Sequence, residues 1–181
     1  MTASACASSI VRAAFPAEER DAVAAEFRLA MRRLASGVAL VTSCDAEGRP
    51  CGIAMTAFMS LTMDPPALLI AVNRTASLCS PLLEYGRFAV NMLSEGQADL
   101  CKGFVTTPAA GRFDKLGWSE GPDGIPVVHG AVASIVCAVD KAEAFGSHIV
   151  IRGLVEQVML GDCERPLAYL DGRYGTVQLN A

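Results

Sequence analysis

The sequence of 181 residues contains no apolar run long enough to cross a membrane. Its longest fully apolar runs, such as residues 67–72, fall far short of the roughly 20 residues that a spanning helix needs. The first fifteen residues are rich in Ala and Ser, but they carry no basic residue before Arg12, which disfavours a signal or transit peptide. We therefore expect a cytoplasmic protein with no membrane partner.

Positive charge is scarce and histidine is nearly absent. The 15 Lys and Arg stand against 19 Asp and Glu, for a net charge of −4 at pH 7, so nucleic acid is not an expected partner. The two histidines, His129 and His148, cannot form a histidine-rich metal site, and no cysteine cluster is spaced to complete one. The sequence thus predicts no metal centre.

A disulfide framework and four common catalytic motifs are also missing. The seven cysteines are odd in number and form no C-x-x-C pair, a pattern that favours reduced, packed thiols. The chain has no G-x-G-x-x-G after a strand, no G-x-x-x-x-G-K-[ST], no G-x-S-x-G and no H-E-x-x-H. These absences argue against dinucleotide-fold, P-loop, α/β-hydrolase and zincin enzymes.

Apolar residues, by contrast, make up 52% of the chain, against 19% for charged residues. So little polar surface is unusual for an isolated monomer, and an obligate homo-oligomer would explain it. The length suits one domain. We expect residues 1–16 to form a partly ordered tail and residues 17–181 to form the domain.

Residues 16–36 are predicted to form an amphipathic helix. Acidic residues open this segment and Arg28, Arg32 and Arg33 close it, as the helix dipole favours. Gly37 is the expected C-terminal cap. An apolar stripe at helical spacing runs along the helix and is made of Val23, Phe27, Met31 and Leu34.

After this helix the sequence alternates between short β-type runs and turn residues. Residues 38–43 and 52–61 are predicted to pair as a hairpin. Short helices are expected to begin near Ser80, with Gly86 ending that turn, and at a capping box on Ser94. About seven mostly antiparallel strands favour a closed or nearly closed barrel. The remaining strands are expected at 67–72, 87–93, 127–139, 149–160, 166–170 and 174–179, the last two joined by a turn at Asp171 and Gly172.

Several conspicuous residues have simple structural interpretations. Met55, Met59 and Met63 recur at every fourth residue, and in a strand we expect them to point in one direction and fill the core. His129 is expected to be structural. Trp118 is expected to anchor the loop-rich segment at 103–124, together with Phe113 and Leu116, and a dimer contact is the alternative for Trp118.

A cluster of polar residues brackets the most apolar hairpin. Asn73, Arg74 and Ser77 follow the buried run at 67–72. A cation beside hydroxyls and backbone N–H groups, close to a helix start, is a surface that can hold a phosphate. The alternative is that these strand-end groups satisfy only local backbone hydrogen bonds. The other members of the cluster are Thr56, Ser60 and Thr62.

An ordered series of short motifs extends over nearly the whole domain. It comprises Phe27-Arg28-x-Ala30-Met31, Gly37-Val38-x-x-Val41-Thr42, Gly52, Phe58, Asp64-Pro65-Pro66, Asn73, Ser77, Phe88-Ala89-Val90-Asn91-x-Leu93, Gln97, Phe104, Phe113, Trp118, Gly146-Ser147-His148 and Gly172-Arg173-Tyr174. In these motifs the chain resembles the flavin reductases built on the FMN-binding split barrel, the small components that supply reduced flavin to two-component monooxygenases. The resemblance implies a mainly β fold: an antiparallel Greek-key split β-barrel with an N-terminal helix and short peripheral helices. It also implies a homodimer with the flavin near the subunit interface.

The resemblance implies roles for particular positions. The flavin ring and ribityl chain would lie along Pro50, Cys51, Gly52, Ile53, Ala54, Thr56 and Ala57. The ribityl chain and phosphate would be surrounded by Ala71, Val72, Asn73, Ser77 and Leu78, and Gly103 and Phe104 would close the site. From the polar cluster, Arg74 is the cation expected to bind there as well. His148 would be the catalytic residue, and it would face the nicotinamide cofactor together with Gly172, Arg173 and Tyr174.

The implied reaction is hydride transfer from C4 of NADH or NADPH to N5 of a flavin, either FMN or, as alternatives, FAD or riboflavin. A partner monooxygenase would receive the reduced flavin by diffusion. Many relatives carry hydroxyl residues where this chain has Ala54 and Ala57, so we expect the flavin to be a passing substrate. Two alternatives stay open: a ferric or cobalt-chelate reductase that uses the same flavin, and a split barrel that binds flavin or haem without turnover.

Overall fold

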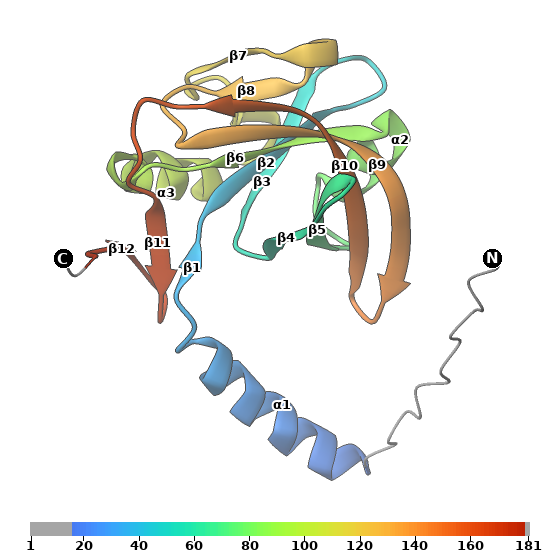
Figure 1. The fold of residues 1–181 in the computed structure, drawn as a ribbon. Helices are drawn as coiled ribbons and strands as arrows, with labels where there is room; N and C mark the ends of the chain where they lie inside the picture. The colour runs from blue at the N-terminus through green and yellow to red at the C-terminus, as the bar shows by residue number, and fades with distance from the viewer. Residues whose placement is uncertain (1–15, 180–181) are drawn as a thin grey trace. The chain divides into compact units, whose positions relative to one another are not determined.

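A computed structural model describes residues 16–179 and divides the chain into two units, Met1–Leu34 and Ala35–Ala181 (Figure 1). The first unit contains the helix α1, which spans Ala17–Met31. The predicted helix is thus confirmed, but it ends earlier than expected, because Arg32 is its C-terminal cap and Gly37 lies in a strand. Apart from Pro16, the expected tail lies outside the described residues.

The second unit is built on a seven-stranded antiparallel sheet in the order β3-β2-β6-β9-β10-β5-β4 (Figure 1). The mainly antiparallel β class is confirmed. Within the described residues the sheet is not closed into a barrel, because its edge strands β3 and β4 do not pair with each other. The strands span Ala39–Cys44 (β2), Pro50–Met55 (β3), Phe58–Met63 (β4), Pro66–Asn73 (β5), Arg87–Met92 (β6), Ala133–Phe145 (β9) and His148–Leu160 (β10).

Two smaller sheets and several short helices complete the second unit. One sheet contains β1 (Ser36–Gly37), β11 (Leu167–Leu170) and β12 (Arg173–Thr176), and the other contains β7 (Trp118–Glu120) and β8 (Pro126–Val128). The helices are α2 (Cys79–Tyr85), α3 (Ala98–Thr106) and the 3-10 turns η1 (Glu95–Gln97), η2 (Ala109–Gly111) and η3 (Pro122–Gly124). Between residues 16 and 179, no helix is long and apolar enough to span a membrane.

Most residues predicted to begin or end these elements do so in the structure. The capping box on Ser94 is present, and Gly86 ends α2 in the left-handed region with φ of 75°. Asp171 and Gly172, with φ of 49° and 79°, form the turn between β11 and β12. The start of α2 differs from the prediction, because its N-cap is Leu78 and not Ser80.

The predicted single strand at residues 52–61 is wrong, because this run forms two strands at opposite edges of the large sheet. β3 ends and β4 begins on either side of Thr56 and Ala57, which carry the chain between the two edges. The Ala57 carbonyl accepts a hydrogen bond from Ala71 N–H at 3.0 Å, which holds the crossing against β5. The β-type pattern is the same on both sides of Thr56, so the sequence does not mark such a crossing.

The methionines of this run do not all fill the core. Met55 is partly buried and packs against the main core. Met59 and Met63 are 60% and 77% exposed, so the expectation for these two residues is wrong. They lie on edge strand β4, where alternate side chains face away from the core.

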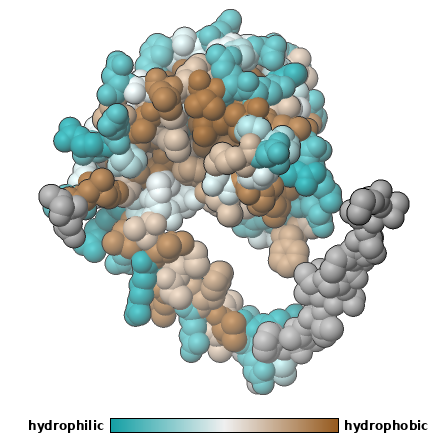
Figure 2. All heavy atoms as spheres, viewed as in Figure 1, coloured by the Kyte–Doolittle hydropathy of each residue, from teal (hydrophilic) through white to brown (hydrophobic). Residues whose placement is uncertain are grey.

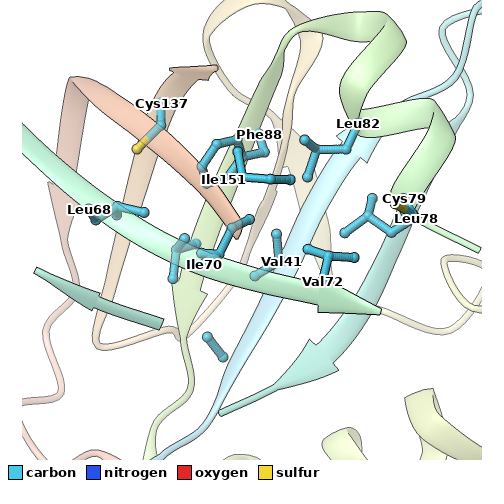
Figure 3. Close-up of a cluster of buried hydrophobic side chains, with 12 residues drawn as sticks. Val41, Leu68, Ile70, Val72, Leu78, Cys79, Leu82, Phe88, Cys137 and Ile151 are labelled. Atoms are coloured by element: carbon cyan, nitrogen blue, oxygen red, sulfur yellow. The ribbon is translucent and has the colours of Figure 1, made fainter. Parts of the chain in front are cut away.

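The apolar interior is divided by β2, because successive side chains of a strand point to opposite faces. Val41 belongs to the main core, whereas Leu40 belongs to a second cluster that packs α3 and β11 against the sheet. Figure 3 shows the main core, in which buried side chains of the large sheet and of the α2 region gather: Val41, Leu68, Ile70, Val72, Leu78, Leu82, Phe88, Cys137 and Ile151.

Asn91 of β6 is fully buried and joins four segments of the chain. Its Nδ2 donates hydrogen bonds to the Leu40 carbonyl and to the Thr42 hydroxyl, both at 3.0 Å. Its Oδ1 accepts from Val128 N–H at 3.1 Å and from the Ser134 hydroxyl at 2.7 Å. The amide therefore ties β2, β6, β8 and β9 together, and each of its buried polar groups has a partner.

We expect Asn91→Ala to lower the free energy of unfolding by about 3 kcal/mol, because it leaves several buried donors and acceptors without partners. Asn73→Ala removes an exposed amide and is the matched control, with an expected cost below about 1 kcal/mol. Urea unfolding followed by circular dichroism measures both values. Equal, small losses for the two variants would show that the buried amide does not organise the sheet.

Candidate flavin site

Gly52 of β3 lies where the edge of the large sheet meets aromatic residues of α3 and of the following loop. It pairs with Thr42 of β2. A Cβ at this position would lie 2.9 Å from the Val41 carbonyl oxygen, 3.2 Å from the Phe113 ring and 3.3 Å from the Phe104 ring. Packing inside the chain therefore requires glycine here, whether or not a ligand is bound.

Three aromatic rings cover this end of the sheet. The centroids of Phe104 and Phe113 are 5.7 Å apart, and those of Phe113 and Trp118 are 5.8 Å apart, both in edge-to-face geometry. Phe113 and Leu116 are buried and Trp118 packs against the same cluster. The prediction that these three residues anchor the loop-rich segment is confirmed.

Arg112 connects the aromatic cluster to β3 and to the chain before α2. Its Nε donates to the Thr107 carbonyl at 3.1 Å. Its Nη1 donates to the Gly52 carbonyl at 2.9 Å and to the Ser77 hydroxyl at 3.3 Å. The guanidinium carbon lies 5.4 Å from the centroid of the Phe104 ring. Gly52, Ser77 and Phe104, three residues expected to contact flavin, thus meet around one side chain.

No sequence motif pointed to Arg112. It lies in the irregular segment at 103–124, outside every predicted motif, and its partners are 60 and 35 residues away in the chain. The one available signal was its place directly before the apolar anchor Phe113.

A hollow of about 270 Å³ opens beside Arg112. Arg112 and Lys115 bring positive charge to it, and the Asp99 carboxylate is held by the Lys102 ammonium at 2.9 Å. A Cβ at Gly103 would find nothing within 4 Å, so α3 is open at this position. The full lining is Asp99, Leu100, Gly103, Phe104, Thr107, Gly111, Arg112, Lys115 and Leu116.

The segment after β5 forms a turn that leads toward α2. Asn73 Oδ1 accepts hydrogen bonds from the N–H and the hydroxyl of Thr75, both at 2.9 Å, so its amide oxygen is engaged locally. Val72 and Leu78 are fully buried in the main core. Only the backbone atoms of these two residues can therefore face a ligand, whereas Ser77 presents an exposed side chain.

His148 begins β10 and lies beside Asn73, its partner in the register of β5 and β10. Its Nδ1 is 2.9 Å from the Ser147 hydroxyl, and its side chain is exposed. Arg74 N–H donates to the Ser147 carbonyl at 3.0 Å. The structure thus places His148 next to the polar end of β5, at an open strand end.

The hairpin residues Gly172, Arg173 and Tyr174 lie against a different part of α3. The Tyr174 hydroxyl is 3.3 Å from Cys101 Sγ, and burial raises the pKa of the Tyr174 phenol above its usual range. With Lys102, the hairpin residues line a second hollow of about 680 Å³. Among residues 16–179, no hydrogen bond or ion pair joins this hairpin to β3 or to His148.

The other residues expected to contact flavin lie along β3 and its crossing to β4. Pro50, Cys51, Ile53 and Ala54 are partly buried, and Thr56 is exposed. Burial raises the pKa of the Cys51 thiol to about 12, so this thiol stays protonated at neutral pH and is no nucleophile. In the part of the chain that the structure describes, no group of three His, Cys, Asp or Glu is gathered as a metal site.

Comparison with known proteins gives a consistent set of relatives. The chain matches the family described as flavin reductase like domain over residues 31–178. FMN reductase (NADH) RutF from Stutzerimonas stutzeri is 35% identical over 150 residues, which cover 82% of this chain and 86% of the relative. The 4-hydroxyphenylacetate 3-monooxygenase reductase component from Salmonella typhi is 31% identical over 156 residues, covering 84% and 91%. A probable flavin reductase from Rhizobium meliloti is longer: the match at 35% identity covers 71% of this chain but only 41% of that protein.

A solved structure supports the same relationship. NADH:FAD oxidoreductase SgcE6 from Streptomyces globisporus C-1027, in complex with NAD and FAD fragments, superposes with a TM-score of 0.80 at 27% identity. The superposition covers 93% of this chain and 99% of that protein.

We expect Gly52→Ala to lower the free energy of unfolding by about 2 kcal/mol, because the added methyl meets a backbone carbonyl and two packed rings. Gly103→Ala is the matched control, since its methyl enters open space on a helix and should raise stability by up to about 1 kcal/mol. Thermal and urea unfolding measure both. If Gly52→Ala is as stable as the native protein, the tight contact around β3 does not exist.

Proposed function

Because this chain belongs to the flavin-reductase-like domain family, we propose that it is an NAD(P)H:flavin oxidoreductase that reduces FMN, with FAD or riboflavin as alternative acceptors. One observation carries the proposal: Gly52 of β3, Phe104 of α3 and Ser77 before α2 meet around the Arg112 guanidinium. The family resemblance assigns flavin contacts to the first three of these residues independently of their positions in space.

The residues present suit a flavin nucleotide. β3 is an edge strand, so part of its backbone N–H and C=O groups face away from β2 and can bind the polar edge of a flavin ring. Such backbone contacts do not depend on the hydroxyls that are absent at Ala54 and Ala57. The buried Phe104 and Phe113 rings pack edge to face on one side of this region.

When bound, the flavin supplies the hydride-accepting chemistry, so the chain needs no nucleophile of its own. Its residues bind and orient the two cofactors. The Ser77 hydroxyl and nearby cations favour the anionic part of the flavin, and β3 fixes the ring. Holding both reactants in one geometry is the main catalytic contribution that such a site makes.

We assign the nicotinamide cofactor to the strand end around His148. The imidazole is exposed, is held by Ser147, and lies next to Asn73 at the end of β5. Its proposed part is to contact and orient the nicotinamide. The hairpin at Gly172, Arg173 and Tyr174 is proposed to face the same cofactor, although it lies at the other hollow of α3.

We propose that the reduced flavin diffuses to a partner monooxygenase, a role supported by the name of the Salmonella typhi relative. We also propose a homodimer. Large apolar side chains are exposed on both units, among them Phe27 at 64%, Met63 at 77% and Phe145 at 70%, and Figure 2 shows apolar surface on each. A cytoplasmic location is supported by the six described cysteines, which are all free.

Steady-state oxidation of NADH and NADPH with FMN, FAD, riboflavin or no flavin tests the proposal. We expect turnover only when a flavin is present. Absence of turnover in every combination, or a tightly bound chromophore that NAD(P)H does not reduce, would refute a reductase.

His148→Ala tests the nicotinamide assignment in the same assay. We expect KM for the nicotinamide cofactor to rise by about fivefold or more while the flavin affinity stays unchanged, because the side chain contacts only that cofactor. His129→Ala is the control, since that histidine lies in the loop after β8, whereas His148 begins β10. Loss of flavin binding with normal reduction would contradict the assignment.

A further inference from the structure

Arg112 is a half-buried cation that no carboxylate among residues 16–179 neutralises. Three arginines of the large sheet and its turns, Arg49, Arg87 and Arg152, each pair with an Asp or Glu, whereas Arg74, in the turn after β5, is exposed to water. A charge that loses part of its hydration without gaining a counter-ion costs free energy. Carbonyl groups of the chain offset part of this cost at Arg112, and an anion that binds from outside the chain would offset more of it.

The Arg112 guanidinium is held in a fixed orientation. The Thr107 carbonyl accepts from Nε and the Gly52 carbonyl accepts from Nη1, so the plane is fixed by two backbone groups. Nη1 also reaches the Ser77 hydroxyl at 3.3 Å, while Nη2 has no hydrogen-bond partner in the described part of the chain. The Nη2 N–H groups of the planar guanidinium and the neighbouring Ser77 hydroxyl together form a set of donors that matches a phosphate group.

The surroundings of this donor set favour a negative ligand. Lys115 lines the same hollow as Arg112, and the Asp99 carboxylate there is paired with Lys102 at 2.9 Å. The phosphate site expected from sequence had Arg74 as its cation. The Arg74 side chain is exposed, and the described contacts place Arg112 at the Ser77 hydroxyl instead.

We propose that Arg112 binds the phosphate of the flavin nucleotide and thereby makes the protein select FMN or FAD over riboflavin. The inference rests on the proposed function, because it names the residue that reads the flavin substrate at that site. Nicotinamide dinucleotides also carry phosphates. An experiment must therefore distinguish a flavin phosphate from a dinucleotide phosphate.

Dissociation constants for FMN and riboflavin, measured by flavin fluorescence quenching, test the proposal without requiring turnover. We expect native protein to bind FMN more tightly than riboflavin. Arg112→Gln should weaken FMN binding about tenfold or more, the loss of one charged hydrogen bond, and should change riboflavin binding by less than about twofold. Arg74→Gln tests the cation expected from the sequence, and it should weaken FMN binding by less than Arg112→Gln does.

Arg112→Lys keeps the positive charge but removes the planar set of guanidinium N–H donors. We expect FMN binding to weaken about threefold and riboflavin binding to stay unchanged. If Arg112→Gln does not fold, this variant still tests whether Arg112 contributes to FMN binding and not to riboflavin binding. KM for NADH, measured with riboflavin as acceptor, should be the same in native and Arg112 variants.

Three results would overturn the assignment. If Arg112→Gln weakens the binding of FMN and riboflavin equally, Arg112 only stabilises the position of β3. The assignment would also fail if Arg74→Gln weakens FMN binding more than Arg112→Gln does, or if the Arg112 variants raise KM for NADH and leave the preference between the flavins unchanged. If the preference for FMN depends on Arg112 but NAD(P)H does not reduce FMN in the presence of the protein, this inference is supported and the reductase function is refuted. The two claims therefore fail separately.

Discussion

The hydrogen bonds of the buried Asn91 amide fix the part of the sheet on which the candidate site is built. Asn91 donates to the Thr42 hydroxyl, which in turn donates to the Pro126 carbonyl at 2.5 Å. Thr42 is also the strand partner of Gly52. The position of β3 at the sheet edge thus depends on a network in which every buried polar group is satisfied, and a network of this kind permits one arrangement of its strands.

The site beside this network is assembled from distant parts of the chain. β3, the turn before α2, the end of α3 and the loop after it each contribute one contact to the Arg112 guanidinium. The glycine at position 52 is explained by packing within the chain, whereas the proposed reason for the cation beside Ser77 is an external anion. These two causes are separate, so flavin affinity and protein stability need not change together when the site is altered.

Sequence alone predicted the features that depend on neighbours in the chain. The Ser94 capping box, the left-handed Gly86 and the turn at Asp171 each follow from residues within one turn of one another. The crossing at Thr56 was missed because the edge on which a strand lies depends on sheet order, not on its own apolar pattern. Arg112 was missed for a similar reason, since its partners lie 60 and 35 residues away. The family resemblance implied cofactor contacts at β3, Ser77 and His148, but it carried no information about which cation stands beside the Ser77 hydroxyl.

The central claim is that this chain brings a nicotinamide and a flavin together for direct hydride transfer. Anaerobic rapid mixing of the protein and FMN with NADH, followed by the loss of oxidised-flavin absorbance, tests it most directly. We predict bleaching whose rate constant falls when the transferred hydrogen at C4 is replaced by deuterium. Bleaching no faster than in a mixture without protein, or a rate constant for the bleaching that deuterium at either C4 position leaves unchanged, would contradict the account.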